Sequence, residues 1–413
     1  MDAHKIVAHQ FRHSYGAMVA ALSKRFGIHH LHDIEDVVQE SLFKAMKIWP
    51  FKGVPVHPQA WLIRTAGNAL IDKLRADQRK RNIPSTNQHD SFEPTDPATN
   101  ETIEDDQLQM IFMCCHPDLS ERNQIILTLK LVAGFGNLEI AAALLQKADA
   151  VAKAYTRAKK KIRDQAVKLV TPIEIGLSSR LPIVLKIIYL IFSEGYRTHF
   201  GKAPIQKDLC YEAIRLALLL DRNKYCSKPN THALLAMMSF HASRFETRVD
   251  EDGCIIDLEQ QDRSIWDQEL ISIGRRYLSK STDASNEPTD YLFQAIISYH
   301  HCKAKTYVDT AWDKILALYD MELTRRYTPI IALNRIVPLM MAHGFEIGLD
   351  ALQTYKNQAR GPINTLYYAI KARLLEMSRN IDGAIDAYKD AIKISDNEAE
   401  TKYLIKRKEA LLE

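Results

Sequence analysis

DIEDVVQESLFKAMKIWPFKGVPVHPQAWLIRTAGNALIDKLRADQRKR, residues 33–81, is the stretch that decides the fold of the N-terminal part of this chain. It predicts two helices of opposite character, joined by a loop rich in proline and glycine. The first helix opens after Asp33 with Glu35 and Asp36 in its first turn, where carboxylates suit the positive end of a helix dipole. We expect Trp49-Pro50 and the Gly53–Pro58 segment to end it.

The second helix of this stretch is basic. Its polar residues Arg64, Asn68, Arg75 and Arg79 recur with a period near 3.6, and leucine and alanine form the opposite side. The helix finishes in Arg79-Lys80-Arg81. An acidic helix followed by a basic helix that opens on an aromatic residue indicates a protein partner for the first and a polyanion for the second.

Composition limits the class of protein. At 413 residues the chain is too long for one ordinary core and predicts two or three domains. Its hydrophobic content of 46% and charged content of 26% are typical of soluble globular proteins. The net charge is only +4, so any binding of nucleic acid has to come from local basic patches.

The cysteines and the apolar runs indicate the compartment. The six cysteines follow no regular spacing and the chain shows no signal peptide, which fits a reducing cytoplasm. The longest apolar run, Leu181–Phe192, is interrupted by Pro182 and Lys186 and is too short to span a bilayer. We therefore expect a cytoplasmic protein without a membrane partner.

A second module follows a change in composition. Residues 83–106 are rich in Ser, Thr, Asn and Pro, close on an acidic IEDD, and predict a linker without its own core. Helices resume at residue 107. The run from Leu138 to Leu145, a short turn and a helix from Ala150 to Arg163 predict a helix-turn-helix. The second of these helices carries a basic set: Lys153, Arg157, Lys159, Lys160 and Lys161.

The two modules resemble the second and fourth conserved regions of bacterial extracytoplasmic-function sigma factors, in the sigma-70 family. The second-region pattern is D-x-E-D-x-V-Q-E with a following aromatic, and then W-L-x-x-x-A-x-N-x-x-I-D-x-x-R. The resemblance implies contacts to core RNA polymerase from Asp33, Glu35, Asp36, Val38, Gln39, Glu40 and Phe43. It implies contacts to promoter DNA from Trp61, Arg64, Asn68, Arg75, Arg79, Lys80 and Arg81, and from the basic set of the helix-turn-helix.

The fourth-region likeness departs from the family pattern at two positions. Ala150 stands where a Thr or Ser commonly caps the recognition helix, although Asp149 is an alternative cap. Ala154 stands where an Arg is common. We therefore expect little direct base readout and a larger share of phosphate contacts from this helix.

More than half of the chain follows these modules. Apolar periodicity predicts helices over 181–192, 209–220, 233–244, 292–303 and 312–325. Residues 248–258 alternate around Asp252-Gly253 and predict a small β-hairpin.

A repeat is visible near the end of the chain. The pairs Ile315/Tyr319, Ala351/Tyr355 and Ala384/Tyr388 recur at intervals of 36 and 33 residues, on either side of the roughly 34-residue tetratricopeptide period. Degenerate repeats at about 305–413 would stack into a surface for a protein or peptide partner. An ordinary helical domain with coincidental spacing is the alternative.

The whole chain resembles the subgroup of these sigma factors that carries a tetratricopeptide-like extension. The likeness rests on CCHP at 114–117, LIFSEGY at 190–196, LCYEAIRLA at 209–217 and QDRSIWD at 261–267. In that subgroup the extension is thought to replace or supplement a separate anti-sigma factor. An enzyme's acid/base set at Asp257, Asp262, Arg263 and Asp267 is the alternative, but no nucleophile, metal set or phosphate loop accompanies these residues. We expect a structural network or a docking surface there instead, with a docking set of Asp262, Arg263, Trp266 and Asp267.

Two clusters resemble metal sites without meeting their spacing. Cys114-Cys115-His116 lacks the C-x-x-C separation, and we expect buried thiols near a helix end. The histidines of the N-terminal segment share no tight spacing and have no cysteine beside them: His4, His9, His13, His29, His30 and His32. We expect no metal and no cofactor.

We therefore expect an all-α chain. Its predicted parts are a region 2 module at 1–82, a linker at 83–106, a region 4 helix-turn-helix at 107–170 and a helical extension at 171–413. The function expected is that of a sigma factor, which is not an enzyme because the polymerase supplies the chemistry. The alternative is a DNA-binding regulator with a helical-repeat sensor that does not replace a sigma subunit.

Overall fold

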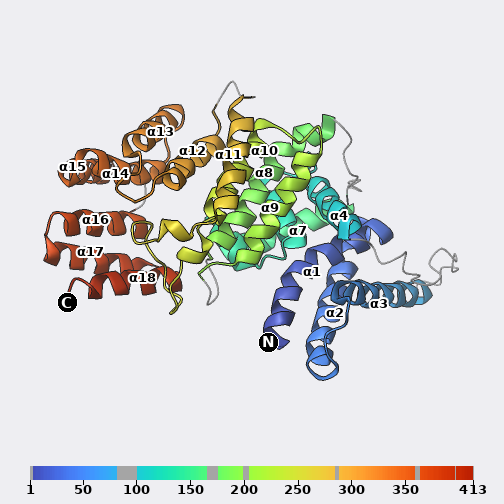
Figure 1. Cartoon of the computed structure of the whole chain (residues 1–413). Helices are drawn as coiled ribbons and strands as arrows, with labels where there is room; N and C mark the ends of the chain where they lie inside the picture. Colours follow the sequence, from blue (N-terminus) through green and yellow to red (C-terminus); the bar gives the residue numbers. More distant parts are fainter. Residues whose placement is uncertain are drawn as a thin grey trace. The chain divides into compact units, whose positions relative to one another are not determined.

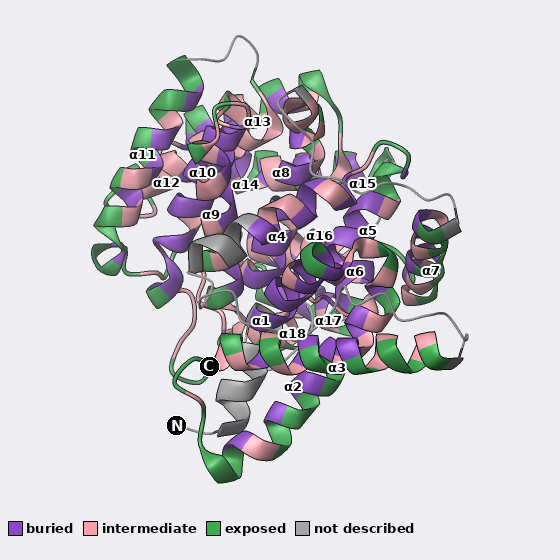
Figure 2. Cartoon of the chain, turned by 90° about the vertical axis from the view of Figure 1, so that its right-hand side faces the viewer, coloured by how far each residue is buried: buried purple, intermediate pink, exposed green. Residues whose placement is uncertain are grey.

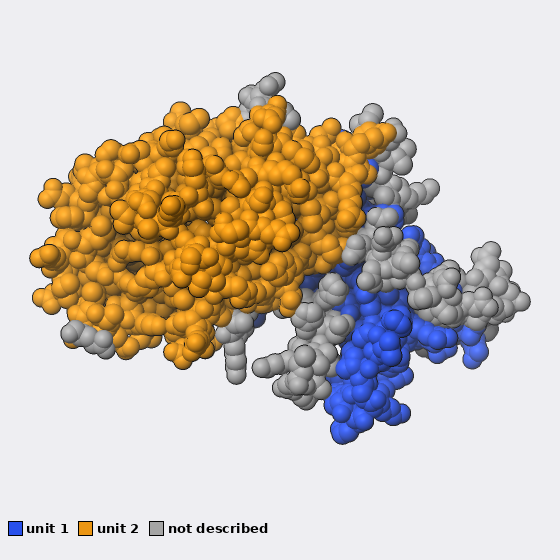
Figure 3. Space-filling model, in the orientation of Figure 1, with its two compact units in different colours: residues 1–191 blue, residues 192–413 orange. Residues whose placement is uncertain are grey.

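The computed structural model describes residues 3–80, 100–164, 175–198, 204–283, 288–358, 363–395 and 397–412. Side chains are described from residue 14 to 79, from 106 to 163 and from 176 onward within these ranges. The described residues form eighteen α-helices and no β-sheet, which confirms the all-α prediction. The chain divides into two compact units, unit 1 at 1–191 and unit 2 at 192–413 (Figure 3).

Unit 1 is built around its first helix (Figure 1). Helix α1 packs against α2, α3, α4 and α5. The helices of this unit are α1 (Ala3–Phe26), α2 (Leu31–Lys52), α3 (Pro58–Lys80), α4 (Asn100–Cys114), α5 (Glu121–Leu131), α6 (Asn137–Ala143), α7 (Ala148–Asp164) and most of α8 (Ile175–Tyr196).

A glycine allows α1 and the end of α5 to approach closely. A Cβ atom on Gly16 would lie 2.0 Å from the carbonyl oxygen of Val132, so no larger residue fits while the backbones keep this distance. Val132 is the C-cap of α5. The N-terminal helices and the helix-turn-helix part therefore share one packed core in unit 1.

Three helix bounds differ from the expectation. Helix α2 runs through Pro50 and ends at Lys52, with Gly53 at positive φ as its C-cap. This is possible because Pro50 lies in the last turns and its side chain is exposed. Helix α4 begins at Asn100, inside the expected linker, since the acidic residues IEDD suit a helix N-terminus. Asp149 lies in the first turn of α7 and is not its cap.

Unit 2 begins with a block of helices around α10, and the labelled purple ribbon of α10 in Figure 2 marks its burial. Helix α10 is buried on nearly all sides because α9, α11 and α12 pack against it. Gly274 of α11 lies directly against the ring of Phe240 on α10. The bounds are α9 (Lys207–Arg222), α10 (Pro229–Ala242), α11 (Gln268–Asp283) and α12 (Asp290–Lys303).

The remaining helices of unit 2 pack in sequence, each against the next. They are α13 (Trp312–Arg325), α14 (Pro329–His343), α15 (Phe345–Asn357), α16 (Thr365–Met377), α17 (Ile381–Ile394) and α18 (Glu398–Glu409). The small-residue and tyrosine pairs of the expected repeat fall on alternate helices, α13, α15 and α17. Tyr355 and Tyr388 are buried in two hydrophobic clusters. The tetratricopeptide assignment stays a prediction.

The expected β-hairpin is reduced to one bridge. Residues 248–258 turn at Gly253, which has φ +76°. A single antiparallel bridge joins Val249 and Ile255, and neither residue belongs to a strand.

The apolar run in α8 is part of a longer helix than expected. Within the described residues, the stretch Gly176–Tyr196 is 21 residues long and apolar enough to cross a membrane by length and composition. This corrects the expectation that the run is too short. A helix that packs on a protein core passes the same test, and Leu185, Ile188 and Phe192 of α8 are buried.

Candidate functional site

The exposed edge of α2 carries part of the set expected to bind polymerase. Gln39, Glu40 and Phe43 are exposed, and the Phe43 side chain is 56% accessible. The Nζ atom of Lys47 lies 4.4 Å from the centre of the Phe43 ring. Val38 is fully buried and packs in the core, so its side chain is not on this edge.

Two further carboxylates of the set are paired with α3. Lys73 of α3 donates to Asp33 at 2.9 Å and to Asp36 at 2.8 Å. Burial lowers the pKa of Lys73, but the hydrogen bonds to Asp36 and Asp33 outweigh it and raise the pKa to about 12. These ion pairs join α2 to α3 and leave Asp33 and Asp36 half-buried.

Glu35, on the same helix, is turned toward the helix-turn-helix. Its side chain is buried and accepts a hydrogen bond from the Tyr155 hydroxyl of α7. Lys159 of α7 donates to the other carboxylate oxygen at 2.8 Å. Burial, together with the Glu35 charge, raises the pKa of Tyr15 and Tyr155 well above the ordinary value. The structure thus joins one residue expected at the polymerase to one expected at DNA.

The basic face of α3 is presented as the periodicity predicts. Arg64, Asn68, Arg75 and Arg79 are all exposed along one helix, and α3 shows a row of exposed residues in Figure 2. Trp61 opens the helix half-buried, and its ring meets Trp49 edge-on with centroids 5.6 Å apart. The Lys80 side chain and Arg81 lie outside the described residues.

Helix α7, the expected recognition helix, presents only part of its basic set outward. Lys153, Arg157 and Lys160 are exposed. Lys161 donates to the carbonyl oxygen of Asp118 at 2.6 Å, and Lys159 is held by Glu35.

The two alanines of α7 have a structural explanation in part. Ala154 is buried against the rest of the module, so its position does not face outward in this structure. Ala150 is half-buried. Any direct readout by α7 therefore depends on the residues around Lys153 and Arg157.

An exposed apolar patch at the end of α2 and in the loop after it was missed by the sequence reasoning. Phe51 and Val56 are each 90% accessible, and Met46 and Val54 are exposed beside them. Exposed apolar residues grouped this closely mark an interaction surface rather than a core. The sequence could have indicated this patch, because large apolar residues stand beside and within a segment rich in glycine and proline.

The four residues of the expected docking set have internal contacts. Arg263 donates to the carbonyl oxygens of His301 at 2.7 Å and Ala304 at 3.1 Å. Trp266 is buried and its Nε1 donates to Thr247 at 2.9 Å. The other two, Asp262 and Asp267, accept from the backbone N–H groups of Ser264 and Leu270. A docking role for this set stays a prediction.

Cys114 and Cys115 are buried thiols at the end of α4, as expected. Burial raises the pKa of Cys115 to about 12, with smaller opposing effects from Thr128 and Arg180. Within the part of the chain that the structure describes, no three His, Cys, Asp or Glu side chains are grouped to hold a metal ion.

Comparison with known proteins supplies two family matches. The family model for sigma-70 region 2 matches residues 11–80, and a family of unknown function, DUF6596, matches residues 180–282. An uncharacterised protein of Rhizobium meliloti (strain 1021) is 30% identical over 375 residues, which cover 90% of this chain and 88% of the relative. No solved structure matches.

Proposed function

This chain belongs to the sigma-70 family, and from that premise we propose that it is an extracytoplasmic-function sigma factor with a fused C-terminal regulatory domain. Binding to core RNA polymerase and to promoter DNA in general follows from the family. The proposal adds the type of sigma factor, a cytoplasmic location and a protein or peptide partner for the helical extension.

The observation that carries the proposal is the pair of surfaces on α2 and α3. The region 2 match covers both helices. Gln39, Glu40 and Phe43 lie exposed on α2, while Arg64 and Arg75 are exposed on α3. Phosphate contacts position a protein on DNA, and bases exposed on melting stack on aromatic side chains. The exposed apolar patch from Phe51 to Val56 adds surface on which unpaired bases can stack.

The Glu35–Lys159 ion pair bears on how these surfaces are used. While it is closed, the two charges neutralise each other and neither is available to an external partner. Use of Glu35 at the polymerase together with Lys159 at DNA therefore requires this pair to open. Because Glu35 is buried, opening the pair is costly unless α2 and α7 separate so that both charges reach water or a new ligand.

The experiment is run-off transcription by purified core polymerase with the full-length chain, on genomic fragments that include the gene's own upstream region. Wild type is expected to give specific transcripts. The charge reversal Glu40→Lys should reduce them at least tenfold, because it places a cation in the expected polymerase contact. Glu409→Lys, an exposed carboxylate on the last helix, is the matched control and should leave them unchanged.

The alternative function predicts a different outcome of the same experiment. Binding of wild type to the DNA fragments, without binding to core polymerase and without transcripts, would overturn the sigma proposal in favour of a DNA-binding regulator.

A further inference from the structure

We propose that the basic and aromatic surface of α16 and α18 is a receptor for an extended acidic peptide, and that the chain's own residues 250–259 occupy it in this structure. This inference rests on the proposed function in one respect, since it gives the chemistry of the partner proposed for the extension. The peptide would come from a partner protein and would displace the chain's own segment.

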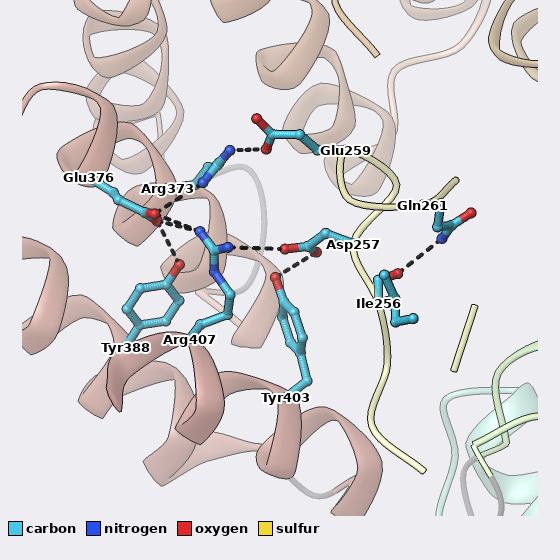
Figure 4. A network of polar contacts seen from close by, with 9 residues as sticks. All are labelled: Ile256, Asp257, Glu259, Gln261, Arg373, Glu376, Tyr388, Tyr403 and Arg407. Atoms are coloured by element: carbon cyan, nitrogen blue, oxygen red, sulfur yellow. Dashed lines mark hydrogen bonds and ion pairs between the residues drawn. The ribbon is translucent and has the colours of Figure 1, made fainter. Parts of the chain in front are cut away.

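The occupying segment, which we call the strap, is residues 248–262. Between 250 and 259 it holds five carboxylates, Asp250, Glu251, Asp252, Asp257 and Glu259, and no lysine or arginine. Hydrogen bonds between its own residues hold its two ends together. The backbone N–H of Ile256 donates to Arg248 at 2.9 Å, and the Gln261 side chain donates to the Ile256 carbonyl at 3.0 Å (Figure 4).

The strap meets α16 and α18 through its acidic residues. Lys406 donates to Asp250 at 2.7 Å, and Lys402 donates to the carbonyl oxygen of Asp252 at 2.7 Å. The hydrogen bond from Lys406 is the main reason why the pKa of Asp250 lies below its ordinary value.

The second half of the strap makes three more polar contacts. The Tyr403 hydroxyl donates to Asp257 at 2.7 Å, and Arg407 pairs with the same carboxylate at 3.6 Å. Arg373 pairs with Glu259. Figure 4 shows Asp257 and Glu259 pointing from the strap toward these side chains.

The cations are held in place by the helices themselves. Glu376 of α16 accepts from Arg407 at 2.6 and 2.7 Å and from Arg373 at 3.1 Å. The Tyr388 hydroxyl of α17 also donates to Glu376, at 3.2 Å. Glu376, itself held by Tyr388, thus fixes both guanidinium groups from within the helices, in addition to the carboxylates of the strap. A receptor arranged in advance loses less entropy when it binds.

The strap does not fill the surface that it covers. A cavity of about 380 Å³ remains beside it, within the size range of ligand pockets. Asp257 and Glu259 line it from the strap, and aromatic side chains line it from the helices and from the segment between α12 and α13: Tyr307, Trp312, Tyr319, Tyr388 and Tyr403. The cavity is partly open to solvent.

The cavity indicates a further feature of the partner. Leu258 separates the two strap carboxylates and lies at the cavity without filling it. The buried Nδ1 atom of His301, which lines the cavity, has no protein hydrogen-bond partner. A peptide with one carboxylate on each side of a large aromatic residue would keep the ion pairs of the strap and also fill the cavity.

The outer ion pair of the strap is of a kind that exchanges, whereas the inner pair of Arg407 and Asp257 is less exposed. Lys406 and Asp250 have side chains 62% and 22% accessible, and exposed ion pairs contribute little to stability because water and salt screen them. A second acidic segment offered at high enough concentration therefore competes with the strap on similar terms.

The test uses the full-length chain and a labelled synthetic peptide of residues 249–262 with Cys254→Ser. Its binding is measured by fluorescence anisotropy at low salt, without polymerase or DNA, so its outcome is independent of the sigma proposal. Wild type should bind weakly because its own strap competes. The protein variant Asp257→Asn/Glu259→Gln should bind the peptide at least tenfold more tightly than wild type. Adding Lys402→Glu/Lys406→Glu to this variant should remove the gain in affinity.

Two controls keep the test decisive. A peptide with every Asp and Glu replaced by the amide should not bind, and equal binding would overturn the role of charge. Asp250→Asn/Glu259→Gln, both in exposed ion pairs, serves as a second strap variant if the first one unfolds. If a folded strap variant binds the peptide no more tightly than wild type, the strap is a fixed structural element and the proposal is wrong.

A last arm examines the cavity. The same peptide with Leu258→Trp should bind several-fold more tightly, because the indole has room beside Trp312 and Tyr388. An equal or lower affinity would contradict the part of the proposal that assigns an aromatic residue to the partner.

Discussion

The two units each join distant helices by polar contacts, and they do so in opposite ways. In unit 1 the contact between α2 and α7 depends on one buried carboxylate, Glu35, shared by Tyr155 and Lys159. In unit 2 the contact between the strap and α16 and α18 is spread over several carboxylates, and its outer ion pairs are exposed.

The difference predicts where each contact is sensitive. A buried charge that loses its partner pays the full cost of desolvation, so a single substitution at Glu35 acts on the whole contact. Exposed ion pairs are screened and each contributes little, so the strap should tolerate single changes and respond to salt. The first arrangement suits a contact with two defined states, and the second suits exchange with a competing ligand.

The largest effect is expected from Gly16→Ala. The new Cβ atom would lie 2.0 Å from the Val132 carbonyl oxygen, so α1 and α5 have to move apart. We expect a loss of ~3 kcal/mol or more in the free energy of unfolding, at the upper end of overpacking effects. Urea denaturation followed by circular dichroism measures it, and wild-type stability would show that α1 and α5 do not pack as described.

Glu35→Gln should have the next largest effect. The amide keeps the shape of the side chain but removes the charge that Lys159 pairs with, and we expect a loss of ~2 kcal/mol. Glu40→Gln on the exposed edge of the same helix is the matched control and should change stability by less than ~0.5 kcal/mol. Equal effects of the two variants would contradict the contact between α2 and α7.

Acidification should destabilise unit 2 through two partly buried histidines, His241 and His301. Burial, with Arg244 nearby, lowers the pKa of His301 to about 3 and that of His241 well below 6.5. Below pH ~6.5 the unfolded chain binds protons that the folded chain does not, so stability falls as pH falls. Each histidine accounts for at most ~1.4 kcal/mol per pH unit.

The measurement for this prediction is the urea midpoint between pH 7 and pH 5. His301→Gln should flatten the dependence on pH in that range. An unchanged slope in this variant would show that His301 does not titrate between the folded and unfolded states.

The smallest effect is expected from Asp250→Asn. The pKa of Asp250 is lowered in the folded state, so its contribution is present above pH ~4 and lost as pH falls below that value. Because the pair with Lys406 is exposed, we expect no measurable change in the urea midpoint at physiological salt. A clear loss of stability at neutral pH would show that the strap is a fixed part of the fold.

Much of unit 1 was predictable because its signals are local. The apolar periodicity of residues 33–81 placed α2 and α3, and the row of Arg64, Asn68, Arg75 and Arg79 lies exposed as the period implies. The bounds were less predictable. Helix α2 continues past the exposed Pro50 to Lys52, and the acidic residues after Asn100 belong to α4 rather than to a linker.

The sequence by itself determined the helical class, the family through its spaced motifs, and the exposed basic and acidic faces, because helix periodicity and side-chain charge act over a few residues. Only the tertiary structure decided that Glu35 is buried against Tyr155, 120 positions away, and that the strap lies on α16 and α18. Such contacts depend on which surfaces the cores leave facing each other, and a carboxylate in the sequence carries no sign of whether water or a distant tyrosine will be its partner.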